Sequence, residues 1–410
     1  MPSANSLIRM RDTSGLVLDL IRSGGEISRV ELAGQSGLTE ASISRIVREL
    51  LDGGVILETG FGLSTGGKRP TLLKVNNRSR HAVGAFLGES AVHYVLADLG
   101  GSVVATLETA GVAHSSLQDL LRRMPAELDK LIRASGVPVD SLVGVGIAAP
   151  GRRELGTIPR YDELRDFVDW DWRQIEAELA ASTGLAVAVE NDSTCAAIGE
   201  YWVSGASATE HFLVVNLSIG FGCGLVTGGD VYRGASSNVG EIGHMTIDWD
   251  GPQCPCGGHG CLEVLAAPAR VVAQALEIDG LQGRLGLSAE KGDHWSDFER
   301  IAAAAMNGDA QAVDLVEHSA RALATALVSL TNVLDLQRIV LTGPGFDVAG
   351  EIYARITREV LEARALIRNA HTFEVRLSAS RHGSAALGAA TLAIHQQLGG
   401  SRRSRALLGT

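Results

Sequence analysis

The sequence predicts an α/β body of two related lobes, preceded by a small α+β head. Residues 1–80 contain two short helix signals joined by a glycine turn and followed by two strand signals. Residues 81–410 contain a strand meander followed by alternating helices and strands, and this order occurs twice. The chain has 410 residues, of which 45% are hydrophobic and 20% charged, so each part is long enough to bury a core.

The head has the element order of a winged helix-turn-helix. Ser14–Ser23 has the apolar spacing of an amphipathic helix. Ser28 and Glu31 form a capping box that begins a second helix, and Gly37 ends it with a left-handed turn. Thr39 then caps a third helix with apolar residues at helical spacing. Two short helices joined by a glycine turn predict a reader of the DNA major groove.

A basic hairpin follows these helices and predicts the wing. Val55–Glu58 and Thr71–Val75 are the expected strands, and a glycine-rich segment connects them. Cations at its tip would reach phosphates or a minor groove. The alternative is a small helical domain with a solvated basic loop. The expected DNA contacts are the polar and basic residues of the last helix and the wing tip: Ser42, Ser44, Arg45, Arg48, Lys68 and Arg69.

Charge is distributed unevenly along the chain. Residues 1–80 hold 11 basic and 8 acidic residues, whereas residues 81–410 hold 25 basic and 39 acidic ones. A basic head on an acidic body suits a head that meets a polyanion. Because one such head reads only half a site, we expect a homodimer or homotetramer on palindromic operator DNA.

Several protein classes are excluded. Polar residues interrupt the apolar stretches well before the roughly 20 residues that a membrane helix needs. Met1–Asp12 has no apolar core of a secretory signal. Five cysteines are too few for a disulfide framework, and three of them fall between Cys254 and Cys261. We therefore expect a cytoplasmic protein without membrane insertion.

The body follows a polar linker at Asn76–Arg80. Two rounds of the same element order predict two related lobes with a cleft between them. The predicted strands are 82–87, 92–97, 103–108, 143–149 and 187–190, then 212–217, 223–227, one opening at 228–230, 338–342 and 375–378. The predicted helices are 116–135, 172–182, 193–203, 309–335, 352–363 and 384–397.

A cysteine-rich turn predicts a structural zinc site. Three thiols, Cys254, Cys256 and Cys261, lie within eight residues of one another, and His244 precedes them. Three thiolates and one imidazole close a tetrahedral zinc shell and leave no position for catalytic water. His259 is the alternative fourth ligand. Cys195 and Cys223, by contrast, are expected as small core residues.

Three further places contain candidate binding residues, and at the first two these are polar residues suited to hydroxyl groups. Asn191 and Asp192 end a strand, and Asp192 is also suited to serve as a general base or as a cap for the following helix. Glu241 and His244 precede the cysteines, and Glu263 follows them, where it would also fit an ordinary first helical turn. A glycine-rich turn at 218–224 predicts either a phosphate cradle or a tight hairpin.

These motifs resemble the ROK family (repressors, open reading frames and sugar kinases) over nearly the whole chain. The most specific matches are Glu241-Ile242-Gly243-His244 and Cys254-x-Cys256-x4-Cys261-Leu262-Glu263. The Glu190–Asp192 run, the Gly220–Gly224 turn and the Leu341–Gly345 loop also match. The winged head is similar to that of the family's repressor branch, which responds to glucose, N-acetylglucosamine or xylose.

The resemblance implies a winged helix-turn-helix at 1–80 and a two-lobed, actin-like (ribonuclease H-like) body at 81–410. The first lobe would span about 81–193 plus a final helix at about 381–400 that packs near the head, and the second about 194–380. It implies zinc on the residues His244, Cys254, Cys256 and Cys261. It also implies sugar contacts from Gly151, Asn191, Asp192, Glu241, His244 and Glu263, where Asp192 matches the catalytic base of kinase members.

The chain departs from the family's kinases in the first lobe. Their Asp-x-Gly-x-Thr phosphate loop corresponds here to Phe86-Leu87-Gly88-Glu89-Ser90. Phe86 replaces a metal-holding acid, and Glu89 adds negative charge where phosphate oxygens would lie. Pro344 also alters the late glycine loop expected near adenosine. Since phosphoryl transfer needs a metal and positioned donors to neutralise charge, we do not expect catalysis.

The sequence therefore predicts a sugar-responsive transcriptional repressor that carries structural zinc and a non-catalytic, kinase-like ligand domain. The alternative is an ATP-dependent sugar kinase with a fused DNA-binding head. A docking protein, whose body binds another protein instead of a sugar, forms a third class.

Overall fold

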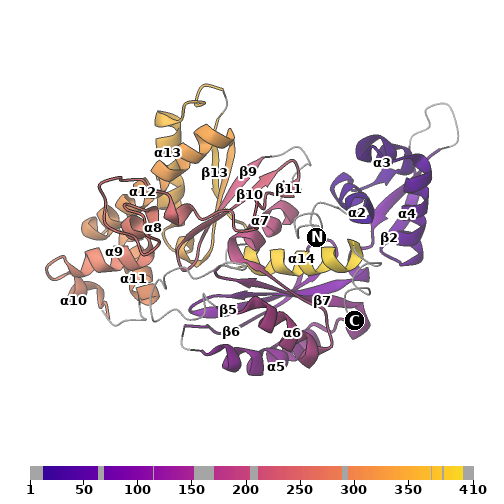
Figure 1. Cartoon of the computed structure of the whole chain (residues 1–410), viewed down its shortest axis with the longest axis horizontal. Helices are drawn as coiled ribbons and strands as arrows, with labels where there is room; N and C mark the ends of the chain where they lie inside the picture. The colour runs from indigo at the N-terminus through magenta and orange to yellow at the C-terminus, as the bar shows by residue number, and fades with distance from the viewer. Residues whose placement is uncertain are drawn as a thin grey trace.

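The structure is a computed structural model that describes residues 13–62, 69–113, 115–151, 170–203, 211–288, 294–370, 372–380 and 383–399. It contains three sheets, one in the head and one in each lobe of the body. Figure 1 shows the head at one side, next to the ends of two helices that run between the lobes. Among the described residues, no helix is long and apolar enough to cross a bilayer.

The head is the predicted winged helix-turn-helix. Ser28 caps the second helix, its hydroxyl accepting a bond from the Glu31 amide, and the Glu31 carboxylate accepts one from the Ser28 amide at 2.8 Å. Gly37 ends that helix at φ 68°, the left-handed geometry expected there. The elements are α2 (Thr13–Gly24), β1 (Ile27–Ser28), α3 (Arg29–Ser36), α4 (Glu40–Asp52), β2 (Ile56–Phe61) and β3 (Thr71–Val75), with sheet order β1-β3-β2. Only the two-residue β1 was not predicted.

The two lobes have sheets of the same order, which confirms the predicted repeat. Each begins with an antiparallel three-strand meander and adds two parallel strands on the other side of the first strand. The first sheet, in the order β6-β5-β4-β7-β8, uses β4 (His81–Leu87), β5 (Ala91–Asp98), β6 (Val103–Ala110), β7 (Leu142–Ala149) and β8 (Val187–Asn191). The second, in the order β11-β10-β9-β12-β13, uses β9 (Phe212–Leu217), β10 (Phe221–Thr227), β11 (Asp230–Val231), β12 (Arg338–Thr342) and β13 (Glu374–Leu377).

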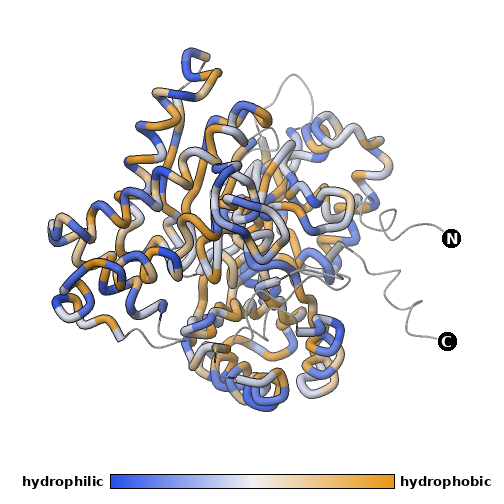
Figure 2. Tube along the Cα trace, turned by 60° about the vertical axis from the view of Figure 1, so that its left-hand side comes forward, coloured by the Kyte–Doolittle hydropathy of each residue, from blue (hydrophilic) through white to orange (hydrophobic). Residues whose placement is uncertain are grey.

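Helices cover these sheets and bury their apolar faces. Figure 2 shows the hydrophobic residues concentrated along the strands and the inward sides of the helices. On the first sheet these helices are α5 (Leu117–Ser135) and α6 (Trp172–Thr183), and on the second α12 (Ala310–Leu334) and α13 (Gly350–Arg364). Of four further helices, α8 (Leu262–Ala266) agrees with the alternative that placed Glu263 in a first helical turn, whereas α9 (Pro268–Leu276), α10 (Leu281–Leu285) and α11 (His294–Met306) were not predicted.

Two helices between the lobes pack unusually closely. They are α7 (Asp192–Val203) and α14 (Ser384–Gly399), and Figure 1 shows both running toward the head. A Cβ on Gly388 of α14 would overlap the carbonyl oxygen of Cys195 in α7, and one on Gly199 of α7 would overlap that of Ser384. Glycine at these positions therefore brings the two backbones into direct contact.

The final helix also packs on the first lobe and reaches the head, as expected. A Cβ on Gly84 of β4 would overlap the carbonyl oxygen of Ala386. At the other end of α14, His395 Nε2 lies 3.6 Å from Asp19 Oδ1 of α2. The strands of the first-lobe sheet lie between His81 and Asn191, and those of the second-lobe sheet between Phe212 and Leu377. The exact domain limits at residues 80, 193 and 380 stay predictions.

The linker at residues 76–80 is bonded on both sides. Asn76 Nδ2 donates to the carbonyl oxygen of Gly54 in the head at 2.9 Å. The amide of Leu99, after β5, donates to the carbonyl oxygen of Asn77 at 2.9 Å. The head is therefore held against the body through main-chain contacts as well as through α14.

Candidate functional site

The outer face of α4 carries the residues predicted to contact DNA. Its inner face buries Ile43, Ile46, Val47 and Leu50, so the helix is fixed against the head core. Ser44, Arg45 and Arg48 are exposed on the other face. Arg45 forms an ion pair of 2.9 Å with Glu49, and both side chains are more than half exposed.

The other three predicted DNA contacts belong to the start of α4 and to the wing. Ser42 is half-buried, and its amide donates to the Thr39 hydroxyl at 3.2 Å, so it belongs to the helix cap as well as to the surface. Arg69 is exposed beside the wing strands, whereas Lys68 lies outside the described residues.

The predicted zinc ligands form one cluster. His244, Cys254, Cys256 and Cys261 each offer a ligand atom, and these atoms all lie within 4.8 Å of one another. Cys256 and Cys261 have their sulfurs 3.7 Å apart, and Cys254 Sγ lies 3.7 Å from His244 Nδ1. Zn–S bonds of about 2.3 Å at tetrahedral angles would place two sulfurs about 3.8 Å apart, so the spacing fits zinc.

Local backbone geometry explains how a short segment reaches this arrangement. The amide of Cys254 donates to the carbonyl oxygen of Gly258 at 2.8 Å, which folds the chain back on itself. Gly257 lies at φ 93°, a conformation that glycine adopts without strain. Burial raises the pKa of Cys261 to about 12 and also raises that of Cys254. His259, the alternative ligand, is not part of the cluster.

Asn191 joins the end of β8 to the start of α7 and to the Gly151 loop. Its Oδ1 accepts bonds from the amides of Ser193 and Thr194 at 3.0 and 3.1 Å, which makes Asn191 the cap of α7. Its Nδ2 donates to the carbonyl oxygen of Gly151 at 2.9 Å. The structure therefore brings together two of the predicted sugar contacts.

Asp192 is buried and accepts four hydrogen bonds. Its Oδ1 accepts from the amide of Ser193 at 2.7 Å and from the hydroxyl at 3.3 Å. Its Oδ2 accepts from Ser218 Oγ at 2.7 Å and from Asn216 Nδ2 at 3.0 Å. Burial raises the pKa of Asp192, and these bonds partly offset the effect.

The glycine-rich turn is a tight hairpin, the second of its two predicted readings. Leu217 of β9 pairs with Phe221 of β10 across it. The Phe221 amide donates to Glu263 Oε2 at 3.1 Å, while Ser218 on the other side donates to Asp192. The hairpin thus lies between two of the predicted sugar-binding carboxylates. A Cβ on Gly220 would overlap the Glu263 carboxylate, which explains the glycine.

The remaining predicted contacts lie on the zinc side of this hairpin. His244 belongs to a short 3-10 helix, Ile242–His244, and Glu241 is exposed just before it. Gly243 lies against the Glu263 carboxylate, because a Cβ added to this glycine would be 2.9 Å from Glu263 Oε2. The zinc cluster and the Asp192–Glu263 region are therefore neighbouring parts of one site.

One buried ion pair here was not predicted. Glu190 is 5% exposed, and its carboxylate pairs with Arg233. It also accepts a bond from the Asn191 amide at 2.9 Å. The pair holds the segment after β11 against the end of β8. Glu190 and Arg233 are 43 residues apart, so no local sequence pattern indicates that they meet.

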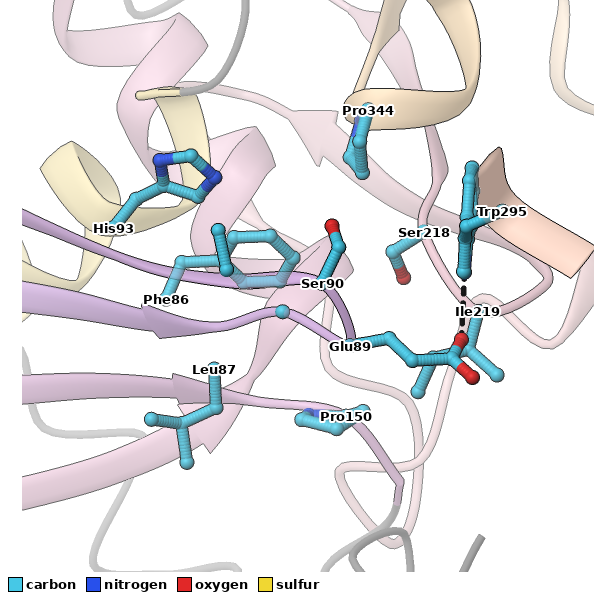
Figure 3. Close-up of a pocket in the computed structure, with 12 residues that line it drawn as sticks. Phe86, Leu87, Glu89, Ser90, His93, Pro150, Ser218, Ile219, Trp295 and Pro344 are labelled. Atoms are coloured by element: carbon cyan, nitrogen blue, oxygen red, sulfur yellow. Dashed lines mark hydrogen bonds between the residues drawn. The ribbon is translucent and has the colours of Figure 1, made fainter. Parts of the chain in front are cut away.

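The corner that corresponds to the kinase phosphate loop is shown in Figure 3. Phe86 is 4% exposed and stacks on His93, with ring centroids 6.2 Å apart. Glu89 connects the two lobes, because its Oε2 accepts a hydrogen bond of 2.6 Å from Trp295 Nε1, which belongs to α11 of the second lobe. Pro344 lines the same pocket.

Comparisons with known proteins identify both parts of the chain. Residues 84–396 match the ROK family, and residues 10–56 match a winged helix-turn-helix DNA-binding domain. The putative xylose repressor of Caldicellulosiruptor sp. is 28% identical over 387 residues, which cover 93% of this chain and 95% of the relative.

Two solved structures show the same fold. A ROK family transcriptional regulator, a homolog of the E. coli MLC protein, superposes with a TM-score of 0.71 at 26% identity, over 95% of this chain and 96% of that one. A ROK hexokinase from Thermus thermophilus gives a TM-score of 0.57 at 26% identity, over 76% of this chain and 98% of that one. The similarity to the regulator thus includes the head, whereas the kinase covers a share that corresponds to the body. The chain belongs to the ROK family and, with its winged helix-turn-helix head, is one of the family's DNA-binding transcriptional regulators.

Proposed function

We propose that this protein is a repressor that binds operator DNA through α4 and the wing and responds to a sugar bound between its two lobes. The observation that carries the proposal is the course of α7. This helix begins at Asp192, in the polar site, and its last turn contains Tyr201 and Trp202, which contact Arg22 of the head. A ligand at one end of α7 is therefore mechanically connected to the DNA-binding unit at the other.

The proposed sugar contacts are Gly151, Asn191, Asp192, Glu241, His244 and Glu263. Carboxylate oxygens accept hydrogen bonds from vicinal hydroxyls, which suits a polyhydroxylated ligand. Asp192 and Glu263 flank the hairpin at residues 218–220, and Asn191 contacts the Gly151 loop. A sugar that bridges these groups would bind one relative position of the lobes better than another, and only such differential affinity shifts the head.

We assign structural zinc to His244, Cys254, Cys256 and Cys261. The spacing of the sulfurs and the four-ligand set fit a closed tetrahedral site. His244 presents Nδ1 toward the sulfurs, so we assign Nε2 to the sugar side. Zinc would then hold the 3-10 helix and the start of α8, and with them Glu241 and Glu263.

Catalysis is not part of the proposal. Phe86 is buried in an apolar cluster and offers no oxygen for a metal. Glu89 places a carboxylate in the phosphate corner. The rival function, an ATP-dependent sugar kinase, has Asp192 and the hexokinase-like fold in its favour. Turnover in a coupled ADP-release assay with a panel of hexoses would establish the rival instead.

Dimers or tetramers on palindromic DNA are part of the proposal, because one head reads half a site. The xylose repressor similarity makes pentoses and hexoses the first sugars to test. As a DNA-binding regulator, the protein would act in the cytoplasm.

The experiment has two arms. DNA fragments selected from a random pool by the full chain are expected to converge on a palindrome, and Arg45→Ala is expected to weaken its binding by about 1–3 kcal/mol if Arg45 reads a base edge. A thermal-shift screen of monosaccharides, amino sugars and their phosphates is expected to find a ligand that raises the melting temperature. The proposal would be contradicted if the pool yielded no selected sequence and no sugar raised the melting temperature.

A further inference from the structure

The corner around Glu89 forms a pocket next to the proposed sugar site. The pocket is narrow: its empty space of about 320 Å³ includes open solvent, and residues of both lobes line it. Ser218 lines it on one side and donates its hydroxyl to Asp192. Pro150, which precedes the proposed contact Gly151, lines it too. A ligand group that extends past Ser218 from the sugar site therefore enters this pocket.

Glu89 is fixed in this pocket and nearly buried. Its side chain is 8% exposed, and Trp295 Nε1 donates to its Oε2 at 2.6 Å. His294 Nε2 lies 3.4 Å from the same oxygen. Figure 3 shows the Glu89 carboxylate below the Trp295 ring, to which the dashed line joins it, whereas the Ser90 side chain points away from it.

The charge at this place is negative. Ser218 lines the pocket together with Glu89 and donates to Asp192, so a ligand group beside Ser218 would approach both carboxyl groups. The described residues that line the pocket include neither lysine nor arginine. Two histidines at this place can carry a positive charge: His93, whose Nδ1 lies 3.4 Å from the Glu108 carboxylate, and His294, whose Nε2 lies 3.4 Å from Glu89 Oε2.

We propose that Glu89 is a specificity-determining residue that restricts the ligand to sugars uncharged at the end that passes Ser218, and that it excludes the corresponding phosphorylated sugars. The inference rests on the proposed sugar-binding function and names the chemical class of the ligand. A hydroxyl donates a hydrogen bond to a carboxylate, whereas a phosphate has only acceptors to offer and adds like charge in a nearly buried site. Like charges brought together in a nearly buried site lower affinity unless a cation intervenes.

The test compares free sugars with their phosphates by calorimetry on the full chain. The probes are glucose and glucose 6-phosphate, N-acetylglucosamine and its 6-phosphate, and xylose and its 5-phosphate. The wild type is expected to bind one free sugar at least roughly tenfold more tightly than its phosphate, in line with like-charge exclusion. Glu89→Gln is expected to raise the affinity for that phosphate by about tenfold while the free sugar changes little, because a glutamine oxygen still accepts from Trp295.

Two further variants separate charge from structure. Trp295→Phe removes the hydrogen bond but keeps the carboxylate, so the phosphate is expected to stay excluded. Glu108→Gln removes a carboxylate of the same neighbourhood that is 68% exposed, so both affinities are expected to remain as in the wild type.

The outcomes distinguish this inference from the proposed function. A wild type that binds the phosphate as tightly as the free sugar overturns the role of Glu89 but leaves sugar binding intact. A Glu89→Gln variant with unchanged selectivity has the same meaning. If the wild type binds neither form of any probe, the sugar-binding proposal fails and this inference fails with it. Should Glu89→Gln not fold, the wild-type ratio and the Trp295→Phe variant still decide the question.

Discussion

The guanidinium of Arg22, in the DNA-binding head, lies over the indole ring of Trp202, 3.9 Å from its centroid. Trp202 belongs to the last turn of α7, the helix that begins at Asp192. The ring centroid of Tyr201 lies 5.6 Å from the same guanidinium. Burial lowers the pKa of Arg22, and Asp19 and Tyr201 oppose this effect. The cation is thus enclosed at the junction of head and body instead of being solvated.

The junction also contains α14. His395 of this helix packs edge-on against Trp202, with ring centroids 4.8 Å apart, and lies 3.6 Å from Asp19 of α2. Since α7 and α14 are themselves in backbone contact through Gly388, the three helices form one connected unit. A shift of α7 at the ligand site would therefore be transmitted to the head.

Arg22→Met is expected to weaken this connection. A cation–π contact contributes about 0.5–1 kcal/mol when exposed and about 2 kcal/mol when desolvated, so the free energy of unfolding should fall by up to about 2 kcal/mol. The variant is expected to keep its sugar affinity while the effect of sugar on DNA affinity becomes smaller. Urea unfolding and DNA titrations with and without sugar measure both quantities. Arg122→Met is the control, because this arginine of α5 is 75% exposed and its ion pair with Asp119 contributes little. An unchanged sugar effect in Arg22→Met would exclude this junction as the route.

Gly388→Ala tests the contact between α7 and α14. A methyl group here would overlap the carbonyl oxygen of Cys195, so the helices must separate. Such overpacking typically costs about 1–3 kcal/mol of unfolding free energy. Gly283→Ala in α10, with nothing within 4 Å of the new Cβ, is the matched control and is expected to be neutral or stabilising by up to about 1 kcal/mol. Equal stabilities of the two variants would show that the helices are not held at backbone contact.

Zinc removal is expected to disturb the ligand site. Elemental analysis of the purified chain should find about one zinc per chain, since four ligands close a single shell. Cys256→Ser should lose the metal, lower the melting temperature by several degrees and abolish stabilisation by sugar, because Glu241 and Glu263 lose their support. Cys223→Ala, outside the cluster, should keep the metal. A metal-free wild type of full stability would contradict the zinc assignment.

His81 makes stability depend on pH. It is buried at the start of β4, with Nδ1 2.9 Å from Ser141 Oγ, and burial lowers its pKa although Asp98 opposes the change. The folded protein therefore binds the proton less readily than the unfolded chain. The contribution of His81 is fully present above its unfolded pKa of about 6.5 and decreases as pH falls below that value. The stability gap between wild type and His81→Gln should thus be smaller at pH 5.5 than at pH 8 in urea unfolding. A gap that widens at low pH would contradict the assigned direction.

Local signals allowed most elements to be predicted from the sequence. Ser28 and Glu31, which form a capping box, are three residues apart, and α5 begins at a second such box formed by Ser116 and Asp119. The His/Cys cluster was equally accessible, because three of its four residues lie within eight residues of one another. In contrast, α9 and α10 have only nine and five residues and are bounded by Pro268, Gly280 and Gly286, so no long periodic pattern exists there.

Contacts between distant residues could not be predicted. Glu89 and Trp295 are 206 residues apart and meet only when the lobes come together. Arg22 and Trp202, 180 residues apart, meet only when the head docks. Asn191 was predicted as a sugar contact, and in the structure it also caps α7, a role the sequence assigned to Asp192. The structure thus adds the partners of the residues that the sequence proposed for the site, whose sugar-binding role stays a prediction.

The most direct test of the central claim is the affinity of the full chain for its selected palindrome, measured by fluorescence anisotropy with and without a saturating concentration of a sugar that raises the melting temperature. Coupling between two sites of one protein usually changes affinity by about 5–150-fold. We expect the dissociation constant to change by a factor in this range. A dissociation constant that is the same with and without the bound sugar would contradict the account.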